Sequence, residues 1–403
     1  IKHECGVVMI RLLKPLDYYR KKYGAYTYGL GKLYLMMEKQ HNRGQEAAGI
    51  GCVKLNAEPG HEYIDRERAL GTGAIQEIFE KVNREVDTAL RNCNASYKET
   101  PYIGELYMGH LRYSTTGRSG MSYVHPFLRR NNWRSRNLLL CGNFNMTNVD
   151  EIFRHVVGEG QHPRIYSDTF MILEQLGHAL DKEHDRLYSL YKNDTPDGAE
   201  LARKIEDNLD LRNILRGNAN LWDGGFVICG MTGSGDMFAL RDSNGIRPAF
   251  YYHDDEIVVV ASERPVIQTV MNVGFDDVKE LTPGSALIVS KNGSLHIDDI
   301  LGEGMNQRCS FERIYFSRGS DKDIYAERKA LGHHVAGDVM EAIGRDLDNT
   351  VLSFIPNTAE VAFYGMMEGL GEYLVAEKSE KIKKLDNNDP EYAEKLNRIV
   401  SRH

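Results

Sequence analysis

The stretch Glu4-Cys5-Gly6-Val7-Val8-Met9-Ile10 sets the first expectation for the fold of this chain. Gly6 to Ile10 is an unbroken run of small and apolar residues after a cysteine, which predicts a buried strand that starts at the thiol. The reference pKa is about 7.7–8.0 for an α-amine and about 8.5 for a thiol, so an amino-terminal Cys5 could pass its thiol proton to its own amine. We therefore expect Cys5 to be a nucleophile and residues 1–4 to be the remnant of a removed leader.

Four polar blocks follow this strand along the chain. They are 42–50 (NRGQEAAGI), 109–117 (GHLRYSTTG), 143–148 (NFNMTN) and 167–169 (SDT). Up to about residue 289, short apolar strands alternate with stretches of helical periodicity. Strands, then helices, then strands predict two sheets that pack together and are flanked by helices.

Composition limits the class of protein. The 403 residues, 41% hydrophobic and 27% charged, suit a globular protein with room for two domains. The net charge of −8 argues against nucleic acid as the main partner, because phosphate binding requires a basic surface. No apolar run predicts a membrane span, and no signal peptide is recognisable. Six cysteines without a C-x-x-C pair favour a reducing, cytoplasmic location.

A change in composition near residue 300 predicts a domain boundary. We expect a first domain over 5–300, and a linker with an incomplete second domain over 301–403. In the second part, 310–316 is expected to be a strand-like link, 324–347 a long amphipathic helix and 351–356 a buried strand that leads into a helix. The charged residues 377–403 are expected to be helical on either side of a break at 387–390.

The ordered blocks resemble the class II glutamine amidotransferases, which use an amino-terminal cysteine. Further motifs at 241–248 (RDSNGIRP), 261–263 (ASE) and 311–318 (FERIYFSR) are similar to one branch, the glutamine phosphoribosylpyrophosphate amidotransferases or amidophosphoribosyltransferases. The resemblance covers about 4–365 with gaps. It implies an α+β fold, a four-layer αββα sandwich of two antiparallel sheets of the N-terminal nucleophile hydrolase type. The start of an α/β phosphoribosyltransferase-like domain would follow, and that domain looks truncated here.

The resemblance implies the chemistry of three residues. Cys5 would attack the side-chain amide of glutamine and form a γ-glutamyl thioester. Asn143 would donate its side-chain amide to the oxyanion, and the backbone N–H of Phe144 would be the second donor. The family has glycine at the position of Phe144, and phenylalanine does not easily adopt a positive φ.

The resemblance also implies four residues that bind the substrate. Arg112 would bind the α-carboxylate of glutamine, for which a guanidinium fork is suited. Asp168 would accept hydrogen bonds from the α-ammonium. Arg43 and Gly44 would form the wall beside the nucleophile, and Asn42 precedes them where the family usually has histidine.

Cofactors are expected only outside this chain. In one branch of the family, a cysteine just before the FE-x-IYF segment ligates an iron–sulfur cluster with three later cysteines. Cys309 has that place, but no cysteine follows it, so no metal is expected in this chain. Mg²⁺ is expected for a full-length enzyme, because it would offset the charge of the pyrophosphate. Neither an acidic strand end nor a phosphate loop is recognisable over 310–403. A tyrosine-rich insertion at 14–28 is expected on the surface near the mouth of the site.

The implied function is hydrolysis of glutamine, with delivery of ammonia for 5-phosphoribosylamine synthesis, the first step of purine synthesis. Glutamine is the expected partner of this chain, and phosphoribosyl pyrophosphate only if the second domain is complete. A homo-oligomer is also expected. Two alternatives stay open: an amidotransferase domain of a different synthase, of the sugar-phosphate type, and a non-catalytic regulatory homologue.

Overall fold

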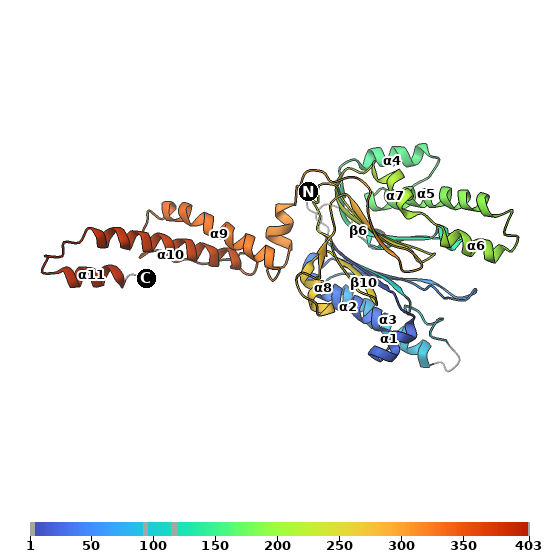
Figure 1. Cartoon of the computed structure of the whole chain (residues 1–403), viewed down its shortest axis with the longest axis horizontal. Coiled ribbons are helices and arrows are strands. Elements are labelled where there is room, and N and C mark those ends of the chain that lie inside the picture. Colours follow the sequence, from blue (N-terminus) through green and yellow to red (C-terminus); the bar gives the residue numbers. More distant parts are fainter. Residues whose placement is uncertain (1–4, 92–95, 114–119, 402–403) are drawn as a thin grey trace. The chain divides into compact units, whose positions relative to one another are not determined.

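The structure is a computed structural model that describes residues 5–91, 96–113 and 120–401. The described chain divides into two units, shown in Figure 1, with the division between Glu312 and Arg313. The sequence placed this boundary at 300, so the residues directly before Glu312 belong to the first unit. The expected leader at 1–4 lies outside the described residues.

The strand that follows Cys5 is central in a seven-stranded antiparallel sheet. The strand order is β11-β9-β10-β1-β4-β2-β3. Met9 in the middle of β1 pairs with Val260 on one side and Met108 on the other. The strands are β1 (Gly6–Leu12), β2 (Ala47–Val53), β3 (Ile64–Leu70), β4 (Leu106–Arg112), β9 (Phe250–His253), β10 (Ile257–Ala261) and β11 (Lys279–Glu280).

A second antiparallel sheet has six strands in the order β13-β12-β8-β7-β6-β5. Its longest pair joins β6 and β7, in which Asn143 is opposite Val227 and Phe144 is opposite Phe226. The strands are β5 (Phe127–Arg129), β6 (Leu138–Met146), β7 (Gly224–Thr232), β8 (Met237–Arg241), β12 (Ser285–Val289) and β13 (Leu295–Asp299).

Helices cover the outer face of each sheet, so the unit is a four-layer αββα sandwich (Figure 1). The helices on the first sheet are α1 (Leu16–Tyr23), α2 (Tyr28–Lys39), α3 (Ala74–Arg91) and α8 (Arg264–Met271). On the second sheet lie α4 (Val149–Gly158), α5 (Asp168–Tyr191) and α7 (Leu211–Ala219), and α6 (Gly198–Asp207) packs on α5. Short 3₁₀ turns are η1 (His41–Arg43), η2 (Met121–Tyr123) and η3 (Arg134–Arg136). The expected α+β fold with two antiparallel sheets is confirmed.

Both faces of β1 are buried, which explains its continuous apolar sequence. Val7 and Met9 belong to the core between the two sheets, and Val8 and Ile10 belong to the core under the outer helices. A strand with only one buried face would alternate apolar and polar residues instead. The predicted buried strand after Cys5 is therefore confirmed.

Alternation along the strands also brings the polar residues of the site together. Side chains two residues apart lie on the same face of a strand. Cys5 lies two residues before Val7, so its side chain also faces the space between the sheets. Asn143 lies two residues after Cys141 of the same core, so its side chain faces this space as well. On β4, Arg112 is on the same face as Leu106 and Met108, whose side chains lie between the sheets. Both sheets thus direct functional groups to one end of the sandwich.

The tyrosine-rich insertion at 14–28 lies at the other end of β1 from Cys5, so its expected place near the mouth of the site is wrong. It forms α1 and the start of α2. Tyr19 is fully buried and donates its hydroxyl to the carbonyl oxygen of Glu256. The same oxygen accepts from the backbone N–H of Leu13, just beyond the end of β1, at 2.7 Å. Because its rings have apolar neighbours there, the insertion extends the core at that end of the sheet.

The regular elements of the second unit are all helical in its described residues. A π-helical turn, η4 (Glu312–Phe316), leads into α9 (Lys322–Ala342), α10 (Glu360–Lys383) and α11 (Tyr392–Val400). The helices expected on both sides of the break at 387–390 form. The helix expected over 324–347 also forms, but it ends at Ala342, and Leu331 and Val335 of its expected apolar face are exposed. α9 and α10 approach so closely that a Cβ at Gly332 would lie 1.7 Å from the carbonyl oxygen of Ala362.

Two expected strands do not form. The segment 310–316 contains the turn η4, and Glu312 at its start accepts a hydrogen bond from Asn143 of the first unit. Residues 351–356 are irregular, and Val351 is 94% exposed. A strand there would require a partner strand for its backbone groups, and the described residues of the second unit contain none.

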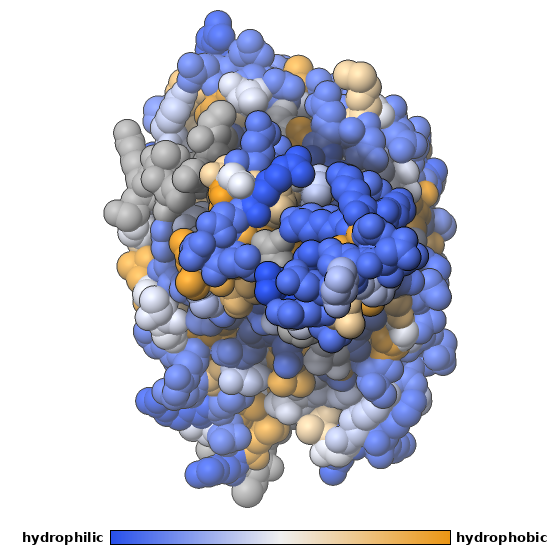
Figure 2. Space-filling model, turned by 90° about the vertical axis from the view of Figure 1, so that its left-hand side faces the viewer, coloured by the Kyte–Doolittle hydropathy of each residue, from blue (hydrophilic) through white to orange (hydrophobic). Residues whose placement is uncertain are grey.

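The visible surface is mostly polar. In Figure 2 hydrophilic residues predominate and apolar residues are scattered among them. α11 has no buried residue at all. Among the described residues, no helix combines the length and the apolar character that a membrane crossing requires.

Candidate active site

A pocket of about 220 Å³ opens at the end of the sandwich where β1 begins. Sites for drug-sized ligands have about 300–1,000 Å³, so this pocket suits a molecule as small as an amino acid. It brings together four residues that the sequence predicted, namely Cys5, Arg112, Phe144 and Asp168. The remaining lining residues are Tyr113, Tyr123, His125, Phe127, Gly142, Tyr166, Ser167 and Thr169.

Cys5 lies at the base of this pocket and is 9% exposed. Its Sγ lies 4.0 Å from the carbonyl oxygen of Tyr113. Its backbone nitrogen donates to Oδ1 of Asn143 at 3.1 Å. An α-amine at this position would therefore have a fixed acceptor next to it, while its thiol faces the pocket.

Asn143 is completely buried and connects three segments of the chain. Its Oδ1 accepts the Cys5 hydrogen bond, and its Nδ2 donates to Oε1 of Glu312 at 3.1 Å. Because one end of the amide faces a donor and the other an acceptor, the network itself assigns oxygen and nitrogen. Nδ2 carries two protons, and the bond to Glu312 uses one of them.

Phe144 keeps an extended backbone and directs its N–H toward the pocket. In the register of β6 and β7 it is opposite Phe226, whose own N–H and C=O are bonded to Asp242 on the other side. The Phe144–Phe226 pair therefore exchanges no hydrogen bonds, and the N–H of Phe144 points away from β7. Two residues earlier, the N–H of Gly142 points to the same side and donates to Nδ1 of His125 at 3.3 Å. Strand geometry thus aims this N–H without the positive φ that glycine would allow.

Arg112 and Asp168 supply opposite charges to the pocket wall. Arg112 is the last residue of β4, and Asp168 is the first residue of α5. The side chain of Ser167 caps that helix, as the sequence predicted. A carboxylate in the first turn of a helix is stabilised by the helix dipole, and Asp168 also accepts from the backbone N–H of Thr169 at 2.7 Å. A cation and an anion beside Cys5 match the carboxylate and ammonium of an amino acid.

Arg43 and Gly44, expected to bind the substrate, do not line the pocket. Arg43 is fully buried, and its Nε donates to the carbonyl oxygen of Cys5 at 3.3 Å. At Gly44 the chain approaches β4 so closely that a Cβ would lie 2.5 Å from the backbone carbon of Leu111. The structure places both residues behind the nucleophile, where they support the backbone that carries Cys5 and Arg112.

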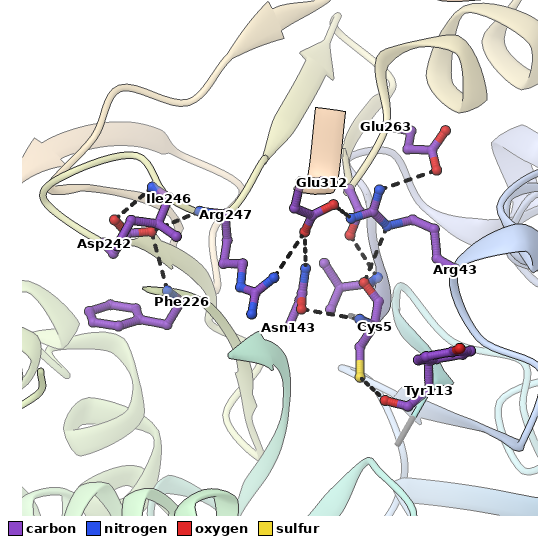
Figure 3. A network of polar contacts seen from close by, with 12 residues as sticks. Cys5, Arg43, Tyr113, Asn143, Phe226, Asp242, Ile246, Arg247, Glu263 and Glu312 are labelled. Carbon is purple, nitrogen blue, oxygen red and sulfur yellow. Dashed lines mark hydrogen bonds and ion pairs between the residues drawn. The ribbon is translucent and has the colours of Figure 1, made fainter. Parts of the chain in front are cut away.

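A buried ion network behind Cys5 was not among the predicted site residues (Figure 3). Glu312, 1% exposed, accepts from Nδ2 of Asn143 and forms ion pairs with Arg43 and with Arg247, the latter at 3.4 Å. Glu263, 3% exposed, is paired with Arg43 at 3.3 Å. These carboxylates and Arg247 come from the motifs at 241–248, 261–263 and 311–318. In the sequence, these charged residues stand within apolar segments, and this was the signal that could have identified them.

Two neutral histidines lie beside the pocket and were also not predicted. The rings of His110 and His125 stack with 4.1 Å between centroids. Nδ1 of His125 accepts from Gly142, so the proton is on Nε2, which lies 3.0 Å from Oγ1 of Thr169. Burial lowers the pKa of His110 to about 3 and holds the pKa of His125 well below its usual 6.5. Neither imidazole is therefore charged near neutral pH.

The described residues do not fit the metals that the resemblance associates with a longer enzyme. They contain no group of three His, Cys, Asp or Glu side chains that could hold a metal ion. Cys309 is partly exposed, and its backbone N–H donates to the carbonyl oxygen of Ile246 at 3.3 Å.

Known proteins are similar to this chain in sequence. Residues 199–313 match the family "Glutamine amidotransferases class-II". The amidophosphoribosyltransferase of Escherichia coli (strain K12) is 25% identical over 365 residues, which are 88% of this chain and 60% of that protein. The amidophosphoribosyltransferase of Bacillus subtilis (strain 168) is 25% identical over 343 residues, or 84% of this chain and 59% of that protein. The chain thus spans about 60% of the length of these curated relatives.

Solved structures support the fold. A structure titled as the allosteric regulatory enzyme of purine biosynthesis aligns with a TM-score of 0.61 at 22% identity, over 91% of this chain and 64% of that chain. The glutamine phosphoribosylpyrophosphate amidotransferase from B. subtilis, complexed with ADP and GMP, aligns with a TM-score of 0.58 at 22% identity and the same coverage. At this identity the likeness concerns the fold alone.

Proposed function

We propose that this chain is a class II glutamine amidotransferase that hydrolyses glutamine at Cys5 and releases ammonia for 5-phosphoribosylamine synthesis. The observation that carries the proposal is the meeting of Cys5, Arg112 and Asp168, from three separate segments, in one pocket of amino-acid size. The names of the relatives support phosphoribosyl pyrophosphate as the acceptor. Mg²⁺, a homo-oligomeric state and a cytoplasmic location remain predictions from the sequence.

Substrate binding comes first. The α-carboxylate of glutamine pairs with Arg112, and its α-ammonium with Asp168, so both charges keep partners when they leave water. These contacts direct the side-chain amide toward Cys5. A pocket of about 220 Å³ leaves little room for a larger amide substrate.

Thioester formation follows. In the proposed active form Cys5 is the first residue, and its amine takes the thiol proton while Sγ attacks the amide carbon of glutamine. The negative oxygen of the tetrahedral intermediate accepts from the second Nδ2 proton of Asn143 and from the N–H of Phe144. The C–N bond then breaks, the ammonium of Cys5 returns its proton to the leaving nitrogen, and ammonia departs. Water next attacks the thioester, which releases glutamate and restores the thiol.

The test is glutaminase activity in a chain that demonstrably starts at Cys5, measured as glutamate released. Cys5→Ala should abolish hydrolysis and block labelling by 6-diazo-5-oxonorleucine, read as intact mass. Cys309→Ser, which alters a thiol that does not line the pocket, should keep both. Equal labelling of Cys5→Ala, or full activity in a sample that retains residues 1–4, would refute the mechanism.

A further inference from the structure

We infer that Glu312 is a positioning residue for the reaction at Cys5, acting through the side chain of Asn143. The inference deepens the proposed function and rests on it. Glu312 lies 169 residues from Asn143 in the chain, yet its Oε1 is 3.1 Å from Nδ2 of Asn143. It does not line the pocket, and its carboxylate is occupied by Asn143, Arg43 and Arg247, so we take its effect on the reaction to pass through Asn143.

A carboxylate at this position determines which end of the Asn143 amide faces Cys5. An ionised carboxylate only accepts hydrogen bonds. It therefore attracts the NH₂ group of Asn143 and repels the amide oxygen, which is left to accept from the nitrogen of Cys5 at 3.1 Å. With the amide turned around, the oxygen of Asn143 would face Glu312 and its NH₂ would face the nitrogen of Cys5. The contact with Glu312 would then pair two hydrogen-bond acceptors.

The orientation matters for both halves of the proposed chemistry. The oxygen of Asn143 holds the nitrogen of Cys5 in the direction in which an α-amine must receive the thiol proton. The NH₂ group carries the proton proposed for the oxyanion. Catalytic donors are effective only when they are already aimed at the developing charge. A residue that prevents the amide from turning therefore raises kcat without contacting glutamine.

Two arginines keep Glu312 ionised and in place. Arg43, fully buried, forms an ion pair with one carboxylate oxygen, and Arg247 lies 3.4 Å from the other. A buried carboxylate with such partners is held both in charge and in direction. Glu312, the first residue of the turn η4, thus gives Asn143 on strand β6 a fixed hydrogen-bond acceptor.

The main test compares Glu312→Gln with the unchanged protein by steady-state glutaminase kinetics. Glutamine at this position can accept or donate, so it no longer dictates how Asn143 is turned. We expect kcat to fall about 10- to 100-fold and KM for glutamine to change less than about threefold, because the charges that bind glutamine are untouched. Glu206→Gln is the matched control: Glu206 is also buried and pairs with Lys291 at 3.0 Å, and kcat should not change.

A double-mutant cycle separates positioning from general damage to the fold. If Glu312 acts through Asn143, adding Glu312→Gln to Asn143→Ala should lower kcat by less than about twofold, because the group to be oriented is gone. A full additional 10-fold loss would overturn the inference, and so would an unchanged kcat in the single variant, or a loss confined to KM. Should Glu312→Gln not fold, Glu312→Asp makes the same test, since it keeps the charge for the arginines and withdraws the oxygen from Asn143. All variants are compared in chains that start at Cys5, and absence of glutaminase activity in the otherwise unchanged chain of this form would instead refute the proposed function.

Discussion

Replacing Arg43 with methionine tests the ion network behind the nucleophile. The side chain of Arg43 has no exposed surface, and those of its partners Glu263 and Glu312 are 3% and 2% exposed. Methionine is also long and flexible, so it fills much of the same space and removes the charge. The variant therefore leaves carboxylates buried without their shared cation.

The expected loss of stability follows from what each carboxylate retains. Removing one partner of a buried ion pair costs about 3–5 kcal/mol, because the remaining charge is uncompensated. Glu312 keeps Arg247 and Asn143, and Glu263 keeps the Nδ2 of Asn42 at 2.9 Å. We therefore expect about 3 kcal/mol at neutral pH, the lower end of that range.

Urea unfolding followed by tryptophan fluorescence measures this loss of stability. Both tryptophans, Trp133 and Trp222, belong to the first unit, so the signal reports that unit. Arg308→Met is the matched control, since Arg308 is 41% exposed and its pair with Glu280 at 3.0 Å should contribute less than about 1 kcal/mol. A loss for Arg43→Met no larger than that of the control would refute the reasoning.

Two further predictions concern the pocket and the histidines beside it. Arg112→Ala should raise KM for glutamine at least about 30-fold, because a desolvated carboxylate then lacks its partner at a cost of about 2–5 kcal/mol, and steady-state kinetics that show an unchanged KM would make Arg112 structural. The first unit should lose stability between pH 7 and pH 5, and in His110→Gln this loss should be smaller by about 2 kcal/mol. The folded pKa of His110, about 3, lies below the unfolded value of about 6.5, so the unfolded state alone gains the proton over that range. Urea unfolding at both pH values measures this, and an unchanged loss in the variant would contradict it.

Local pattern predicted much of the first unit for a physical reason. A strand such as β1 has both faces in a core, and this leaves a continuous apolar run that is visible in the sequence. The cap at Ser167 is equally local, because the capping bond spans three residues. The strand expected over 351–356 failed because its run of apolar residues requires a neighbouring strand, and the described second unit has none.

The site was predicted only in part, because a resemblance shows the order of the residues along the chain and not their positions in space. Cys5, Arg112, Phe144 and Asp168 do share a pocket. Arg43 was expected in the same wall and instead lies behind it, in a position that depends on how closely Gly44 approaches β4. Phe144 looked incompatible with its expected role until the register of β6 and β7 showed where its N–H points.

The amino-acid sequence by itself determined the buried strand after Cys5, the layered α+β fold and the identity of four of the residues that line the pocket. These depend on periodicity and on short motifs, which are local properties of the chain. Only the tertiary structure decided that Glu312, Arg247 and Glu263 converge behind Cys5. Their contacts join segments up to 269 residues apart, and the energy of pairing buried charges appears only when the two sheets and the turn η4 bring them together.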